Sequence, residues 1–194
     1  MYISVTGDGV VFVNAGFSYP LAHSLHEEIH NITSKRVKFV ILENGQGHAA
    51  LGMTYWQEQG ARSIVHEDAA HEFVERGPEI LAAAHHSLKD ESFLTRLGKP
   101  EITFTDKYVI ELGNGRIELL NLGPAHSPGD IVTWLPNRKI AISGDMSFHQ
   151  RMPPAFTAAR NRHTRPRRPH HDCRGDQIHA RLAAILARPD QQDH

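Results

Sequence analysis

The order in which strand-like and helix-like segments follow one another constrains the fold of this chain more than any other feature of its sequence. In the first part, short apolar runs bounded by turn residues predict strands at Tyr2–Thr6, Val10–Asn14, Val37–Leu42 and Arg62–Val65. Helices are predicted between and after these strands at Pro20–Asn31 and Ala49–Gln59, and a helical region interrupted at Gly77-Pro78 is predicted at Glu67–Asp90.

The rest of the ordered pattern consists mainly of strands. They are predicted at Ile102–Phe104, Tyr108–Leu112, Arg116–Asn121, Ile131–Leu135 and Lys139–Ser143. The turn sequence Gly113-Asn114-Gly115 joins two of them and is a strong hairpin signal. Alternating strands and helices followed by a run of strands predict an α/β layered domain, with helices packed on a mixed sheet.

Composition narrows the class of protein. The 194 residues are enough for one domain with a substantial core, and 40% hydrophobic with 22% charged residues is ordinary for a soluble globular protein. No apolar run approaches the roughly 18 residues of a membrane span, so we expect no membrane partner. The start of the chain lacks the layout of a secretion signal, which favours a cytoplasmic location unless a leader was lost with a truncated start. The single cysteine, Cys173, excludes an internal disulfide and a cysteine-built zinc site.

The charge is distributed unevenly along the chain. Residues 1–154 carry 13 Lys+Arg against 18 Asp+Glu, whereas residues 155–194 carry 8 against 4, and all eight of these basic residues are arginine. We therefore divide the chain into a domain at 1–154 and a basic, Arg/His-rich tail at 155–194 that packs poorly. The tail is either a disordered extension or the product of a reading-frame change. It lacks interleaved aromatic residues, so specific nucleic-acid binding is not expected.

Histidines are frequent in this chain, so a single histidine indicates a functional site only when the residues around it form a motif. The chain contains 15 of them. The adjacent pair His85-His86 would point in different directions on a helix and is not expected to chelate one ion. Tyr55 and Trp56, on the predicted second helix, are expected to pack in the core rather than to form a stacking site.

The stretch Leu119–Phe148, LLNLGPAHSPGDIVTWLPNRKIAISGDMSF, carries the most specific chemistry. His126 and Asp145 each lie on a loop that follows an apolar strand, where a rigid sheet can aim both at one point. This stretch closely resembles the second half of the metallo-β-lactamase superfamily, in which G-x-x-H-[ST]-x-G-D precedes a strand that ends in G-D. The resemblance implies that His126 binds a metal and that Asp145 is a bridging metal ligand, while Asp130 more plausibly fixes the loop around His126.

The resemblance extends upstream and covers roughly Met1 to Pro154. VTGDGVVFVNAG resembles the opening hairpin of the family, with Asn14 in place of the usual aspartate. Val37–His66 resembles the strand, metal loop, helix and strand that normally carry T-H-x-H-x-D-H-x-x-G. When Gly52 is aligned with the motif glycine, Asn44 and Gln46 stand at the first two histidines of the motif. His48 then stands at the aspartate and Ala49 at the last histidine. The implied fold is an incomplete αββα layered structure, with a mixed sheet and helices on the outer faces.

The altered motif limits the metal content that the resemblance implies. Zinc sites are built from cysteine, histidine and carboxylate, and amide side chains are poor ligands. A dinuclear site is therefore not expected. The remaining set is at most one divalent ion, zinc or alternatively iron, held by His126, Asp145 and His48. This set requires His48 to point inward, and the alternative is a loop histidine that faces solvent.

Two functions remain open on these residues. In the first, the chain is a metal-dependent hydrolase whose metal-activated water attacks an ester, thioester, amide or phosphoester of an unidentified small molecule. Its predicted catalytic residues are Asp145, Gln46 and Asn44, the two amides orienting water or substrate. In the second, it is a catalytically silent member of the fold that serves as a binding module, or a truncated gene product.

Overall fold

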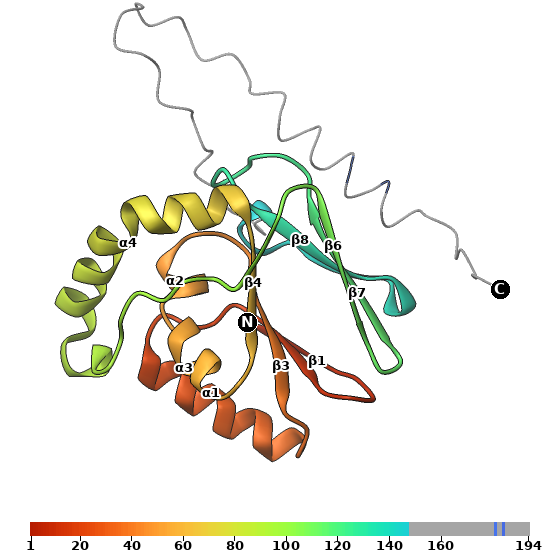
Figure 1. The fold of residues 1–194 in the computed structure, drawn as a ribbon, viewed down its shortest axis with the longest axis horizontal. Helices are drawn as coiled ribbons and strands as arrows, with labels where there is room; N and C mark the ends of the chain where they lie inside the picture. Colours follow the sequence, from red (N-terminus) through yellow and green to blue (C-terminus); the bar gives the residue numbers. More distant parts are fainter. Residues whose placement is uncertain (148–180, 182–183, 185–194) are drawn as a thin grey trace, which may run out of the picture.

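The computed structural model describes residues 1–147 together with residues 181 and 184, and it contains two stacked β-sheets with helices on one side (Figure 1). The first sheet has the order β1 (Tyr2–Val5), β2 (Val10–Val13), β3 (Val37–Leu42), β4 (Arg62–His66) and β5 (Ile102–Phe104). The second has the order β6 (Lys107–Leu112), β7 (Gly115–Asn121), β8 (Ile131–Leu135) and β9 (Ile140–Ile142).

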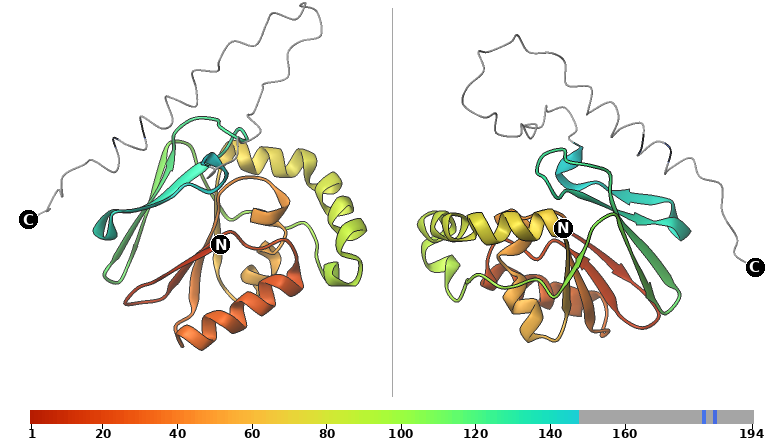
Figure 2. Two further views of the ribbon diagram at one scale, coloured as in Figure 1. Left: turned by 180° about the vertical axis from the view of Figure 1, so that it is seen from behind. Right: turned by 45° about the horizontal axis from the view of Figure 1, so that its top comes forward.

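The helices lie on the face of the first sheet that points away from the second sheet, as Figures 1 and 2 show from three directions. They are α1 (Tyr19–Ile32), α2 (Gly47–Ala50), α3 (Met53–Glu58) and α4 (Glu67–Leu88). Short 3-10 turns follow at η1 (Lys89–Ser92), η2 (Pro136–Arg138) and η3 (Gly144–Met146). In the part of the chain that the structure describes, none of these helices has the length and apolar character needed to cross a bilayer.

The pairing of the strands confirms the predicted α/β class with a mixed sheet. In the first sheet, β1 pairs antiparallel with β2, whereas β2, β3, β4 and β5 pair in parallel. The second sheet is an antiparallel meander. Residues 148–154 of the predicted domain lie outside the described residues, as does the predicted basic tail apart from residues 181 and 184.

The first sheet is buried on both faces because it lies between the helices and the second sheet. Along β2, Val10 and Phe12 pack on the helical side, and Phe12 lies 4.8 Å from the ring of Trp56. Val11 and Val13 alternate with them and pack against the second sheet. Burial on both faces explains why these strands read as continuous apolar runs rather than as alternating ones.

Tertiary contacts divide the second predicted helix in two. The structure has α2 and α3 in place of one helix at Ala49–Gln59, so that prediction is corrected. The break falls at Gly52, where an added Cβ would lie 2.2 Å from the carbonyl oxygen of Ala15. Tyr55 and Trp56 on α3 are buried, as expected, and the indole Nε1 of Trp56 donates to the same carbonyl at 2.9 Å.

The predicted interruption at Gly77-Pro78 is wrong. Helix α4 runs without a break from Glu67 to Leu88 and includes Pro78. It changes direction along its length in Figure 1, and a kink is the usual way in which a helix accommodates an internal proline. Gly77 is buried there, and an added Cβ would lie 3.2 Å from the side chain of Leu97.

The first turn of α4 holds two loops close to each other. An added Cβ on Gly45 would lie 2.5 Å from the carbonyl oxygen of Ala69, and one on Gly129 would lie 2.3 Å from the nitrogen of the same residue. Ala69 is completely buried. The loop after β3 and the loop before β8 are therefore packed against one helical turn, and only glycine fits at both contact points.

This packing leads to a prediction on stability. Gly129→Ala should lower the free energy of unfolding by about 1–3 kcal/mol, the usual cost of overpacking, because the new methyl group meets the backbone of α4. Urea denaturation followed by circular dichroism would measure it. Gly7→Ala is the control, because an added Cβ on Gly7 would lie 3.5 Å from its nearest atoms, an ordinary contact, and Gly7 does not have a positive φ. A Gly129→Ala protein as stable as the wild type would contradict the packing.

Candidate metal centre

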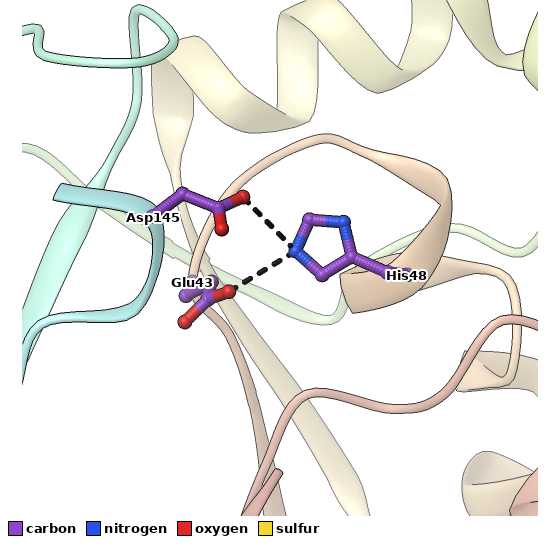
Figure 3. A group of neighbouring side chains, drawn as sticks. All are labelled: Glu43, His48 and Asp145. Carbon is purple, nitrogen blue, oxygen red and sulfur yellow. Dashed lines mark hydrogen bonds and ion pairs between the residues drawn. The ribbon is translucent and has the colours of Figure 1, made fainter. Parts of the chain in front are cut away.

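Three segments that are far apart in the sequence bring ionisable side chains to one point. They are the end of β3 with the start of α2, the loop before β8, and η3. Figure 3 shows Nε2 of His48 between the carboxylates of Glu43 and Asp145. Nε2 lies 3.1 Å from Oε1 of Glu43 and 3.3 Å from Oδ2 of Asp145. One potential ligand atom from each of the three residues lies within 4.8 Å of the others.

Glu43 is held by its backbone on both sides. It directly follows β3, and its N–H donates to Oδ1 of Asn14 at 3.3 Å. Its carbonyl oxygen accepts from the N–H of Ile131, the first residue of β8, at 3.0 Å. Asn14 has a φ of 69°, a conformation that asparagine adopts more readily than most residues. The residue that replaces the family's usual aspartate therefore has a structural role at the candidate centre.

His48 points inward, as the predicted metal set requires, although 39% of its side chain is exposed. The hydrogen bond to Glu43 is the main cause that raises the pKa of His48, and the charge of Asp145 acts in the same direction, while burial opposes both. In the metal-free protein, a protonated His48 therefore contributes stability at low pH. That contribution is lost as the pH rises through the raised pKa.

His126 also faces the group, from the loop before β8. Its Nε2 lies 4.0 Å from Oδ2 of Asp145, far inside the separation of about 10 Å that would have argued against a shared ion. The loop is held by Asp130, whose two carboxylate oxygens accept from the N–H of Ser127 at 2.6 Å and from its hydroxyl at 2.7 Å. Asp130 is buried. The predicted role of Asp130 in fixing this loop is confirmed.

The two amide residues of the altered motif differ in what they contact. Asn44 is completely buried, and its Nδ2 donates to Oδ2 of Asp145 at 3.3 Å. Its Oδ1 accepts from the backbone N–H of Gln46 at 3.0 Å. The amide of Asn44 thus holds Asp145 and the loop, whereas the sequence predicted contact with water or substrate. Gln46 is half-buried on the same loop.

Glu43 is the residue that sequence reasoning missed. Its position corresponds to the threonine before the family's first histidine, so an alignment of ligand positions passes over it. The available signal is an acidic residue directly after the apolar strand Val37–Leu42, where a charge is unusual unless it has a partner. The closest three-residue group in the described part of the chain is thus Glu43, His48 and Asp145, with His126 beside it.

Glycine is required in the G-D sequence for a reason that involves Glu43. Gly144 has a φ of 49°, and an added Cβ would lie 1.9 Å from Oε2 of Glu43. A side chain at this position would displace the carboxylate and strain the backbone at the same time. Asp145, the next residue, is thereby brought close to the carboxylate of Glu43, which directly follows β3.

The donor set fits a divalent ion. Carboxylate oxygens and imidazole nitrogens are ligands of zinc and of ferrous iron, with zinc bonds of about 2.0–2.2 Å. Two donors on one such ion lie roughly 3–4 Å apart, and the separations of 3.1 and 3.3 Å fall in this range.

The hydrogen bond from His48 to Glu43 gives a prediction for the metal-free protein. Glu43→Gln should lower the pKa of His48, because it removes the largest cause of the rise. Titration of the histidine ring protons by NMR would measure this, with His48→Gln identifying the signal. The pKa of His26, which burial lowers, is the internal control and should not move. An unchanged pKa of His48 would show that Glu43 is not its partner.

Comparisons with known proteins agree with the fold. The sequence model of the metallo-beta-lactamase superfamily matches residues 47–176, about two thirds of the chain. The structure is similar to that of a metallo-beta-lactamase from Pontibacter korlensis, with a TM-score of 0.64 and 21% sequence identity over 77% of this chain. The match covers 61% of that protein, so this chain spans about three fifths of its length. The chain belongs to the metallo-beta-lactamase superfamily.

Proposed function

We propose that this chain is a divergent metal-dependent hydrolase of the superfamily, with one divalent ion held by Glu43, His48 and Asp145 and with His126 as a further donor. The observation that carries the proposal is the position of Nε2 of His48, 3.1 and 3.3 Å from carboxylates on two distant segments. The set keeps the three ligands expected from the sequence and adds Glu43.

The substitutions in the metal loop support one ion rather than two. Three positions that carry histidine in the family are occupied by Asn44, Gln46 and Ala49. Alanine offers no donor atom, and amide oxygens are poor ligands for zinc. Moreover, the amide of Asn44 is already engaged by Asp145 and by the backbone of Gln46. The donors that remain are sufficient for one ion, which we take to be zinc, with ferrous iron as the alternative.

The surrounding residues have defined tasks in this proposal. When bound, the ion supplies an acidified water molecule and polarises a carbonyl or phosphoryl oxygen, which is the chemistry of ester, thioester, amide or phosphoester hydrolysis. Asn44 orients Asp145, and hydrogen bonds of this kind to a ligand are commonly worth a factor of about 10–100 in metal affinity. Asp130 keeps the His126 loop in place. Gln46 is half-buried on the loop that carries Asn44, and in this proposal its amide orients the substrate.

Metal binding tests the proposal directly. Isothermal titration of metal-free protein should show a tight zinc site that His48→Ala and Asp145→Ala each remove and that Asn44→Ala weakens by about 10–100-fold. His126→Ala should lower the affinity and any hydrolysis of chromogenic ester, thioester and phosphoester substrates. His85→Ala, on α4 and away from the group, is the matched control and should change neither.

The results divide the two functions that the sequence left open. If His48→Ala and Asp145→Ala each remove two tightly bound ions, the centre does not hold a single ion. If His48→Ala removes no tight zinc or iron ion, the silent binding module is favoured, which the loss of the family's histidines at Asn44, Gln46 and Ala49 supports. If His48→Ala removes a tight ion but no substrate class is hydrolysed, the hydrolase is refuted and the metal site is retained.

The pH dependence of metal affinity follows from the same geometry. A proton on His48 must leave before the metal binds, and the pKa of His48 lies above the usual value of about 6.5. Zinc affinity should therefore keep rising as the pH increases beyond 6.5 and should level off only above the raised pKa. Titrations from pH 5.5 to about 8.5 would measure this. An affinity that is already constant above pH 6.5 would mean that His48 is not a ligand.

A further inference from the structure

A second group of histidines lies on α1 and shares no residue with the candidate metal centre. His23, His26 and His30 are separated by three and four positions, so they lie on one face of the helix. The rings of His26 and His30 are stacked, with their centroids 4.3 Å apart and their planes at 29°. His23 and His30 are exposed, whereas His26 is buried.

His26 is oriented by α3. Its Nδ1 is hydrogen-bonded to the hydroxyl of Tyr55 at 2.8 Å, and its ring packs 5.1 Å from that of Trp56. Within the described part of the chain, Nε2 of His26 makes no hydrogen bond. One ring nitrogen that is held by a neighbouring polar group, with the other left open, is the usual arrangement of a histidine that binds a metal.

The spacing on the helix suits chelation. Two histidines four positions apart on one helical face bind zinc in metalloproteases, because their side chains reach the same point above the helix. His30 has this spacing from His26. The two rings are stacked in the metal-free structure, so chelation requires the exposed ring of His30 to turn toward Nε2 of His26. His23 lies one turn earlier, and its ring is 5.6 Å from that of Tyr55.

We propose that α1 carries a second metal site, in which Nε2 of His26 and a ring nitrogen of His30 bind Zn²⁺, Ni²⁺ or Cu²⁺, with water completing the coordination. A site whose protein donors are imidazoles takes borderline ions of this series. Through the hydrogen bond between His26 and Tyr55, the bound ion is tied to α3 as well as to two turns of α1.

The position of Trp56 gives the site its own optical signal. Ni²⁺ quenches tryptophan fluorescence at short range, and Trp56 packs directly on His26. The chain has two tryptophans, so Trp134→Phe in the full chain leaves Trp56 as the only one. Adding His48→Ala to this background disables the candidate metal centre. Failure of the α1 site and failure of the proposed function can thus be told apart.

Titration of this protein with Ni²⁺ should quench Trp56 along a saturable curve. His30→Ala, an exposed position, should weaken the apparent affinity by about tenfold or more because it removes one metal ligand. His86→Ala, an exposed histidine on α4, should leave the curve unchanged. Quenching that survives His30→Ala, or no saturable quenching at all, would overturn the proposal. If Trp134→Phe does not fold, the same comparison in the chain with both tryptophans gives the same answer at lower contrast.

Discussion

Glu43 is the point at which the two sheets and the candidate metal centre are joined. Its backbone N–H donates to the side chain of Asn14, directly after β2 of the first sheet, and its carbonyl oxygen accepts from Ile131 of the second, while its carboxylate faces His48. A carboxylate this deeply buried is costly unless a cation pairs with it. His48 points inward to this carboxylate, and the absence of a side chain at Gly144 leaves room for it. The geometry of the centre thus depends on a residue at the end of a core strand.

Much of the fold was predictable because its strands are marked by local signals. Val37–Leu42, Ile102–Phe104 and Ile131–Leu135 are apolar runs ended by polar or turn residues, and the observed strands have the same bounds. The errors involve contacts between distant segments. The break at Gly52 depends on the approach of Ala15, and nothing in the local sequence near Pro78 indicates that the helix continues through it. Periodicity detects an element, but it does not show which backbone passes close to it.

The candidate centre was predictable to the extent that it is carried by loops after strands. His126 and Asp145 follow apolar strands, and the sheets bring them to 4.0 Å of each other. The sequence did not identify Glu43, because its role depends on the direction in which its side chain points and on the space that Gly144 leaves for it. The role of Asn44 was also hidden, since an amide at a ligand position looks like a loss. Asn44 is nevertheless buried and donates a hydrogen bond to Asp145.

The two histidine-containing groups differ in whether they include carboxylates. Each group would therefore bind different kinds of metal ion. The group at Glu43, His48 and Asp145 contains two carboxylates, which can neutralise a divalent ion and which also accept harder ions. The group at His26 and His30 contains only neutral donors, so an ion bound there keeps its full charge and must be one with a strong preference for imidazole nitrogen. A group with two carboxylates and a histidine face on an outer helix are therefore different chemical environments on one small domain. Metal bound at one of them implies nothing about the other.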